Sequence, residues 1–165
     1  MHAEGCLLHY AASQGRLELI KIVLAKYPNL MNQSDRYNNT PLLWAAHKGQ
    51  AGVVRYLISQ GADLNTTTNC PGNPHHGKTT LHRAVDEDHK TTVDCLIKAG
   101  AHIDALLLKN PKFHAYLVSV IENNHLALVH RLAKNKTTLT TPMDGMACLI
   151  HLAAKKGRLE VDPTS

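Results

Sequence analysis

The chain has 165 residues, of which 44% are hydrophobic, 4% aromatic and 19% charged, and its formal net charge is +5. This is enough apolar material for a folded core, filled mainly by Leu, Ile, Val and Ala because aromatic residues are scarce. No stretch approaches the roughly 20 apolar residues of a membrane span, and the N-terminus lacks the form of a signal peptide. We therefore expect no membrane insertion and a cytoplasmic or nuclear location.

A unit of roughly 34 residues recurs along the chain. Its most regular copy opens with TPLLWAA at 40–46, and related boxes read CLLHYAA at 6–12, TTLHRAV at 79–85, AYLVSVI at 115–121 and CLIHLAA at 148–154. Counted from the last residue of each box, successive copies are 34, 39, 36 and 33 residues apart. Self-similarity at this period is typical of repeat architectures.

Each copy predicts two helices joined by a tight turn. In the second copy, Thr40 offers a capping hydroxyl before Pro41, so a helix should begin there and run to about Lys48. Apolar residues at 53, 54, 57 and 58 then form one stripe of a second helix, which Gly61 ends. The turn position is occupied in successive copies by Gly15, Gly49, Asp88, Asn124 and Gly157. These residue types tolerate a left-handed backbone best.

The box and the period together resemble those of the ankyrin repeat family, with its T-P-L-H-x-A motif and period near 33. This resemblance implies an all-α fold, a solenoid of stacked helix-turn-helix units joined by β-hairpin-like loops. We place repeats at about 4–35, 36–65, 75–108 and 111–140, with a partial fifth at 144–162, in a single domain 1–165. The fourth copy is eroded, since Tyr116 and Val118 replace the box Pro and His. Pro163 interrupts the fifth, which either caps the array or marks a fragment of a larger protein.

The resemblance also implies that the chain binds a protein partner on the concave face formed by first helices and hairpin tips. Tyr10, Trp44 and Arg83 share one position in consecutive copies, and these residue types dominate binding hot spots. Alternatively, an aromatic side chain at this position packs against the next hairpin. The candidate contact residues on the solvent side of the first helices are Tyr10, Trp44, His47, Lys48, Arg83 and Asp86. Those at the hairpin tips are Arg36, Tyr37, His75, His76, Lys78, Lys112 and Phe113.

A polar insertion at 66–76, rich in Pro, Gly and Asn, separates the second and third copies. We expect a solvated loop on the hairpin side that is a candidate contact element. Cys70, His75 and His76 within it lack a clear fourth ligand, so we predict no metal site there.

Cysteine and histidine also recur in the boxes, as C-x-x-H at 6–9 and again at 148–151. Four layers of helices place these pairs roughly 40 Å apart, too far for a shared zinc ion or a disulfide. We expect reduced thiols. The resemblance implies instead that His9, His82 and His151 form hydrogen bonds with the neighbouring loop.

The sequence carries no phosphate-binding loop, H-E-x-x-H motif or nucleophile elbow, so we predict neither an enzyme nor a cofactor site. The net positive charge invites nucleic-acid binding, but Asp86, Glu87 and Glu122 interrupt the expected concave face, which a phosphate-tracking surface would not allow. We expect a monomer with an acidic protein partner.

Two further expectations remain. One alternative function is that of a targeting or regulatory segment of a larger multidomain protein, such as a host-directed bacterial effector acting in the host cytosol, whose catalytic domain lies elsewhere. The segment from Leu57 to Asn65 looks like the ankyrin hairpin that asparaginyl hydroxylases modify in some members, with Asn65 as the acceptor.

Overall fold

The computed structural model describes residues 3–123 of the chain. It divides the chain into two compact units, Met1–His102 and Ile103–Ser165. The described part is helical, with one isolated antiparallel bridge between Thr67 and Thr79. None of its helices combines the length and the apolar character needed to cross a lipid bilayer. The predicted all-α fold is confirmed.

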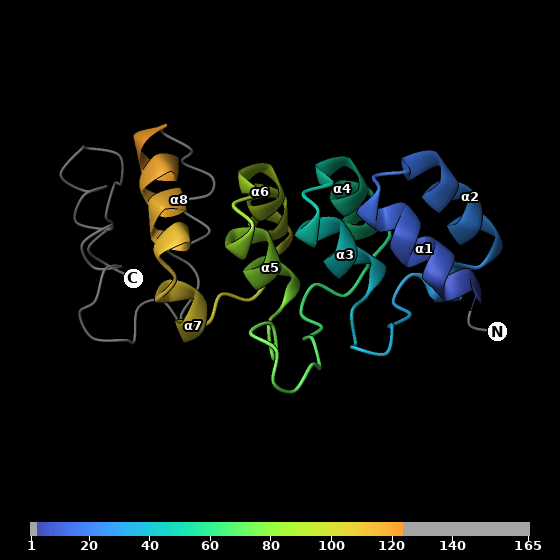
Figure 1. The fold of residues 1–165 in the computed structure, drawn as a ribbon. Helices are drawn as coiled ribbons and strands as arrows, with labels where there is room; N and C mark the ends of the chain where they lie inside the picture. Colours follow the sequence, from blue (N-terminus) through green and yellow to red (C-terminus); the bar gives the residue numbers. More distant parts are fainter. Residues whose placement is uncertain (1–2, 124–165) are drawn as a thin grey trace, which may run out of the picture. The chain divides into compact units, whose positions relative to one another are not determined.

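The first unit contains three helix pairs in two layers (Figure 1). The pairs are α1 (Ala3–Ser13) with α2 (Leu17–Lys26), α3 (Pro41–His47) with α4 (Ala51–Ser59), and α5 (Thr80–Asp86) with α6 (Lys90–Ala99). A short 3-10 helix, η1 (Pro28–Leu30), follows α2. The helix α3 packs between α1 and α5, while α4 packs against α2 and α6. The first helices thus form one layer and the second helices the other.

The capping residues and the turn residues that the sequence predicted have the expected geometry in the first three repeats. Thr40 caps α3, its side chain accepting a hydrogen bond from the Leu43 backbone nitrogen. Thr79 and His82 form a reciprocal capping box at the start of α5. At the turn between the two helices of each pair, Gly15, Gly49 and Asp88 all have a left-handed backbone, with φ of 71°, 67° and 59°.

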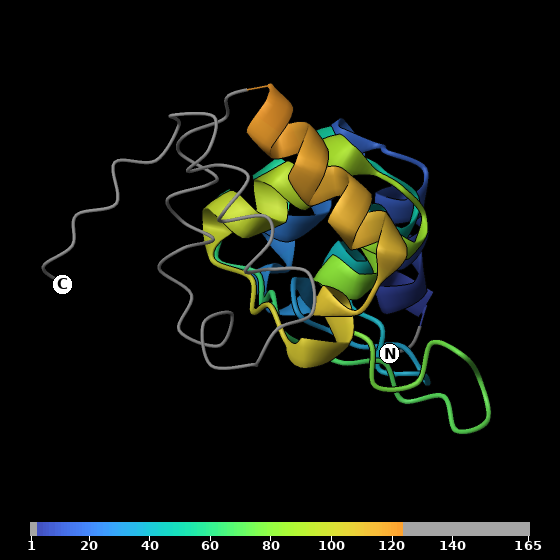
Figure 2. The ribbon, with the colours of Figure 1, turned by 90° about the vertical axis from the view of Figure 1, so that its left-hand side faces the viewer.

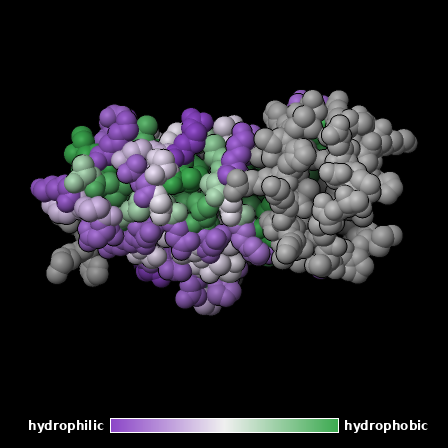
Figure 3. Space-filling view, turned by 180° about the vertical axis from the view of Figure 1, so that it is seen from behind, coloured by the Kyte–Doolittle hydropathy of each residue, from purple (hydrophilic) through white to green (hydrophobic). Residues whose placement is uncertain are grey.

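The core of the first unit lies between the two helix layers. The box leucine and the first small residue after it are fully buried in all three copies, at Leu8, Leu42 and Leu81 and at positions 11, 45 and 84. The apolar stripe of α4 is buried as predicted at Val53, Val54 and Leu57. Seen from behind, the helix pairs present mainly hydrophilic surface, with hydrophobic atoms visible between them (Figure 3).

Side chains of one repeat also bond to the backbone of a neighbouring repeat. Gln50 Nε2 donates to the Ser13 carbonyl oxygen (3.1 Å), and His89 Nε2, in the equivalent place, donates to the His47 carbonyl oxygen (3.1 Å). His9 Nε2 donates to the Asn39 carbonyl oxygen (3.0 Å), which is the loop contact expected of a box histidine. The first, second and third repeats are therefore tied by polar contacts in addition to their apolar core.

The hairpin ends of the repeats carry a second recurring link. Asn32 Oδ1 accepts from the backbone nitrogen of Asp63 (3.0 Å), and Asn65 Oδ1 accepts from that of His102 (3.0 Å). Asn65 is therefore a structural bridge to the next hairpin. Its modification by a hydroxylase stays a prediction.

The second unit is described as far as residue 123 and contains α7 (Ala105–Leu108) and α8 (Pro111–Glu122). Asp104 caps α7 through the Leu107 backbone nitrogen (2.9 Å), and Asn110 caps α8 through that of Lys112 (2.9 Å). Phe113 therefore belongs to the first turn of α8. Its side chain is fully buried and stacks on Tyr116, with ring centroids 5.9 Å apart.

The expectation that Phe113 is an exposed hairpin tip is thus wrong, because the Asn110-Pro111 cap begins the helix before that residue. The fifth copy, the second helix of the fourth copy, Cys148 and His151 all lie outside the described residues. The assignment of all five copies to a single domain stays a prediction.

Candidate functional site

The row formed by Tyr10, Trp44 and Arg83 is not uniformly exposed. Tyr10 on α1 is 63% exposed, Trp44 on α3 is half-buried, and Arg83 on α5 is only 8% exposed. The expectation that Arg83 presents its side chain to solvent is wrong. The physical reason lies in the two elements that enclose it, a histidine of the preceding repeat and the inserted loop.

Trp44 is held by the hairpin that precedes its own helix. Its indole Nε1 donates to Asp35 Oδ2 (3.1 Å), and its ring meets that of His47 edge-on, with centroids 6.1 Å apart. Asp35 also accepts from the backbone nitrogens of Tyr37 (2.8 Å) and Asn39 (2.9 Å). Burial alone would raise the pKa of Asp35, but these hydrogen bonds from Asn39, Tyr37 and Trp44 outweigh it and lower the pKa.

Arg83 reaches back to the preceding repeat. Its Nη2 donates to His47 Nδ1 (2.8 Å), an atom that also lies 3.4 Å from Glu87 Oε1. Burial, followed by the positive charges of Arg83 and Lys48, lowers the pKa of His47 to about 4. His47 is therefore neutral at pH 7, which leaves its Nδ1 free of a proton and able to accept from Arg83.

The remaining nitrogens of Arg83 are less well satisfied. Nε and Nη1 are buried, and within residues 3–123 neither has a hydrogen-bond partner. The same is true of His75 Nδ1. Burial lowers the pKa of Arg83, an effect that the nearby Glu87 and Asp86 partly offset. An arginine nevertheless stays protonated in a protein, so a positive charge is held in a poorly hydrated place.

The inserted loop is anchored at its base and exposed at its tip (Figure 2). The Thr68 backbone bonds in both directions with the strand-like segment opposite, through Lys78 O (3.0 Å) and Gly77 N (2.9 Å). The Asn69 backbone nitrogen donates to the Tyr37 carbonyl oxygen (2.8 Å), and Asn38 Nδ2 donates to the Thr67 carbonyl oxygen (2.8 Å). The loop is therefore docked on the hairpin of the second repeat, and only its tip fits the expectation of a solvated loop.

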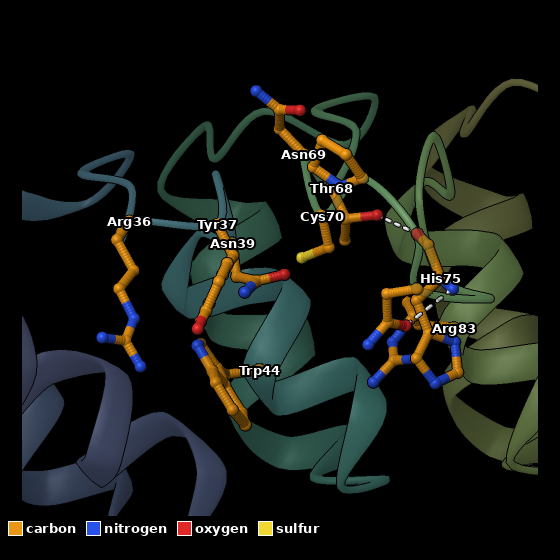
Figure 4. Close-up of a pocket in the computed structure, with 11 residues that line it drawn as sticks. Arg36, Tyr37, Asn39, Trp44, Thr68, Asn69, Cys70, His75 and Arg83 are labelled. Carbon is orange, nitrogen blue, oxygen red and sulfur yellow. Dashed lines mark hydrogen bonds between the residues drawn. The ribbon is translucent and has the colours of Figure 1, made fainter.

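The docked loop forms one wall of an open pocket of about 610 Å³. Its walls come from Arg36, Tyr37 and Asn39 on the hairpin, Trp44 on α3, Arg83 on α5, and loop residues between Thr68 and His75. Figure 4 shows Tyr37 and Trp44 on one side, His75 and Arg83 on the opposite side, and Thr68 and Cys70 above the space between them. Five of the predicted contact residues thus line one pocket, namely Arg36, Tyr37, Trp44, His75 and Arg83.

The other predicted contact residues lie elsewhere. Lys78 Nζ forms an ion pair with Asp86, while Lys48 and His76 are exposed. Lys112 lies on α8 with Phe113, in the second unit. Within residues 3–123 no three His, Cys, Asp or Glu side chains come together as metal ligands do.

Two residues that shape this site were not predicted from the sequence. Asp35 organises the hairpin and holds Trp44, and the buried Thr68 anchors the loop. The spacing of Asp35 and Asn39 is a signal for a side-chain-capped turn and could have been used. Nothing in the run of threonines at 66–68 distinguishes Thr68, because its role depends on the path that the loop takes.

Stacked pairs of antiparallel helices, tied by recurring side-chain bonds and carrying a pocket on a loop between repeats, define a helical repeat protein of the binding-module class. The family model for ankyrin repeats in three copies matches residues 8–106. The chain therefore belongs to the ankyrin repeat family.

Known relatives and solved structures agree with this assignment. The chain is 30% identical over 170 residues to the protein Accelerated Cell Death 6 of Arabidopsis thaliana, covering 90% of this chain and 25% of the relative. It is 42% identical over 155 residues to a human transient receptor potential cation channel of subfamily A, covering 93% of this chain and 13% of the relative. The chain thus spans a quarter or less of these two relatives.

Among solved structures, the chain resembles a chain in the complex of a predatory endopeptidase from Bdellovibrio bacteriovorus with an immunity protein. The TM-score is 0.60 at 27% identity, covering 91% of this chain and 80% of that one. It also resembles the ankyrin repeat domain of human ASB11, with a TM-score of 0.55 at 26% identity, covering 78% of this chain and 53% of that one.

Proposed function

We propose that this chain is a non-catalytic module that binds another protein through the surface formed by α1, α3, α5 and the hairpin ends of their repeats. The observation that carries the proposal is the pocket beside Trp44, which opens among Arg36, Tyr37 and the inserted loop. Tyr and Trp side chains bury large areas at modest entropic cost, and Arg forms fixed hydrogen bonds. Tyr10, which is 63% exposed on α1, extends the same row of residues.

The pattern of charge favours an acidic protein partner over nucleic acid. Arg36 lies over the Tyr37 ring, with its guanidinium carbon 4.7 Å from the ring centroid, and contributes one positive charge at the pocket. However, Asp86 and Glu87 lie on the same helix end as Arg83, so the surface offers no continuous basic stripe for a phosphate backbone.

Affinity capture with matched variants tests this function. The immobilised chain is compared with a Tyr10→Ala/Trp44→Ala double variant and with Ile22→Ala, which removes a 67% exposed side chain from the second-helix layer. We expect the double variant to lose partners that the wild type and Ile22→Ala retain, with all three giving the same helical circular dichroism spectrum. Equal recovery by the double variant would rule out the proposed surface.

A second proposal concerns the context of the chain. Because it aligns with only 25% and 13% of two much longer relatives, it is also suited to act as the targeting or regulatory segment of a larger multidomain protein, including a host-directed bacterial effector. The reading frame around the coding sequence tests this proposal. A stop codon directly after Ser165 and no upstream coding sequence would overturn it.

A further inference from the structure

The positively charged guanidinium of Arg83 is buried without a close counterion among the described residues. It is 8% exposed, and among the described residues only its Nη2 has a hydrogen-bond partner, the neutral His47. Within residues 3–123 no carboxylate oxygen lies within ion-pair distance of it. A buried charge without a close counterion costs several kcal/mol of solvation, so this arrangement favours any anion that reaches it.

The acidic residues nearby are already engaged. Asp86 is paired with Lys78, and Glu87 Oε1 lies beside His47 Nδ1 at 3.4 Å. His75, on the same side of the pocket as Arg83, contributes another buried nitrogen, Nδ1, without a partner among the described residues (Figure 4). Two residues that line the pocket, Arg83 and His75, thus hold three buried nitrogens, Arg83 Nε, Arg83 Nη1 and His75 Nδ1, that have no hydrogen-bond partner among the described residues.

The rest of the pocket suits the stem of a side chain. Tyr37, Trp44, Cys70 and Pro71 provide aromatic, thiol and aliphatic surface, and the space of about 610 Å³ exceeds the volume of a carboxylate group alone. The pocket can therefore bury methylene groups and part of the flanking backbone while the polar end meets Arg83.

We propose that this pocket binds an aspartate or glutamate side chain from an extended acidic segment of the partner protein, with the Arg83 guanidinium as its counterion. The proposal rests on the proposed function, since it names the chemistry by which the partner is recognised. Arginine binds a carboxylate through two parallel hydrogen bonds, here from Nη2 together with either Nε or Nη1, while the second N–H bond of Nη2 stays with His47.

A carboxylate fits the local charge better than a phosphate group. Asp86 and Glu87 lie within electrostatic reach of Arg83, and Lys78 is engaged by Asp86. A dianionic phosphate would add repulsion from both carboxylates with only one guanidinium at the inner wall to offset it, whereas a monoanion is neutralised by that guanidinium.

Nuclear magnetic resonance with defined peptides tests the proposal. The probes are the terminally blocked tripeptide Ac-Gly-Glu-Gly-NH2 and its Gln isostere, titrated into the 15N-labelled 165-residue chain. Trp44 is the single tryptophan of the chain and lines the pocket, so its indole signal reports on occupancy. We expect saturable shifts of the Trp44 indole and Arg83 Nε–H signals, with a Kd on the order of 1–10 mM for the Glu peptide and none for the Gln peptide.

Two pairs of variants assign the effect to Arg83. Arg83→Gln should weaken binding at least about tenfold, while Arg55→Gln, which removes an exposed charge from α4, should leave it within about twofold. Since Arg83 is buried, Arg83→Gln can also disturb folding. Cys70→Glu therefore provides an independent test. Its own carboxylate should occupy the pocket and block the Glu peptide, whereas Cys70→Gln should not.

Several results would overturn the proposal. They are the absence of saturable shifts up to about 50 mM peptide, equal shifts with the Gln peptide, or equal binding by Cys70→Glu and Cys70→Gln. Tighter binding of inorganic phosphate would identify a phosphate site, and equal binding of free acetate would identify a small-anion site; either result would replace the side-chain pocket proposed here.

The peptide titration and the affinity capture can fail independently of each other. Partner capture that depends on Tyr10 and Trp44, combined with no response to the Glu peptide, would leave the binding function standing and remove the carboxylate pocket. A saturable peptide response, combined with equal partner capture by the wild type and the Tyr10→Ala/Trp44→Ala variant, would support the carboxylate pocket and rule out the proposed partner-binding surface.

Discussion

His47 couples the electrostatics of the pocket to pH. Its folded-state pKa of about 4 lies below the ordinary value of 6.5, so the unfolded chain takes up a proton before the folded chain does. The free energy of unfolding should therefore fall as pH drops from about 6.5 to 4, by about 1–2 kcal/mol between pH 7 and 5. Urea midpoints of the wild type and His47→Gln at both pH values measure this contribution.

The exposed His76 supplies the control for this prediction. His76→Gln should keep the wild-type pH dependence, while His47→Gln should lose part of it, because Gln has no titratable group. The pKa of His75 is also lowered by burial, so some pH dependence of the same sign should persist in the His47 variant. Identical pH dependence in the wild type and His47→Gln would show that burial and the neighbouring charges do not keep His47 neutral in the folded chain.

At the same scale, the sequence predicted which residue types gather at the site but not how each is buried. Trp44 and Tyr37 were found from their positions in the repeat, and both line the pocket. Arg83 was expected at the surface because it occupies the same position of the repeat as Tyr10 and Trp44. Its burial depends on the docked loop and on a bond to His47, and neither follows from repeat spacing.

At the scale of elements, the turn between α3 and α4 requires glycine for two separate reasons. Gly49 has a φ of 67°, and a Cβ there would lie 2.6 Å from His89 Nδ1. Gly52, one turn away on α4, has no left-handed backbone, and a Cβ added to it would meet nothing within 4 Å. We expect Gly49→Ala to lower the free energy of unfolding by about 1–3 kcal/mol and Gly52→Ala to raise it by about 0.5–1 kcal/mol.

Urea denaturation of the two variants measures both signs. Comparing the Gly49→Ala/His89→Ala double variant with His89→Ala alone separates the two causes, because both lack the His89 side chain and its hydrogen bond, and only the backbone strain distinguishes them. If Gly49→Ala proved as stable as the wild type, neither the left-handed turn nor the approach of His89 would constrain this position.

Helices that begin with a clear capping residue were predictable from the sequence, with the exception of α8. Thr40-Pro41 and Thr79 begin helices as expected, because a capping hydroxyl and the following geometry are local properties. Asn110-Pro111 carries an equivalent signal and begins α8, but alignment on the eroded fourth box placed Phe113 on a hairpin instead. Local capping chemistry therefore outweighs repeat alignment where the repeat has diverged.

At the scale of the whole molecule, periodicity made the family and the fold predictable, whereas the candidate site arises where periodicity breaks. The 39-residue step between the second and third copies supplies the loop that forms one wall of the pocket. A repeat pattern specifies nearest-neighbour packing, which recurs, but an insertion has no second copy in the chain from which its path could be inferred.

Nearest-neighbour packing makes a quantitative prediction for the three repeats of the first unit. Gln50 ties the second repeat to the first, and His89 ties the third to the second, each through one hydrogen bond of 3.1 Å to a backbone carbonyl. Loss of either bond should lower the free energy of unfolding by about 1 kcal/mol. Because the bonds belong to different interfaces, the Gln50→Ala/His89→Ala double variant should equal the sum of the single variants within about 0.5 kcal/mol.

Gln60→Ala and His76→Ala are the matched controls, since both remove exposed side chains of the same types outside these interfaces. Urea unfolding monitored by circular dichroism should place both controls within about 0.5 kcal/mol of the wild type. A double variant less stable than the sum by more than about 0.5 kcal/mol would mean that the two interfaces support one another through the middle repeat. In that case a ligand in the pocket, which contacts both the second and the third repeat, would stabilise the stack beyond its own contacts.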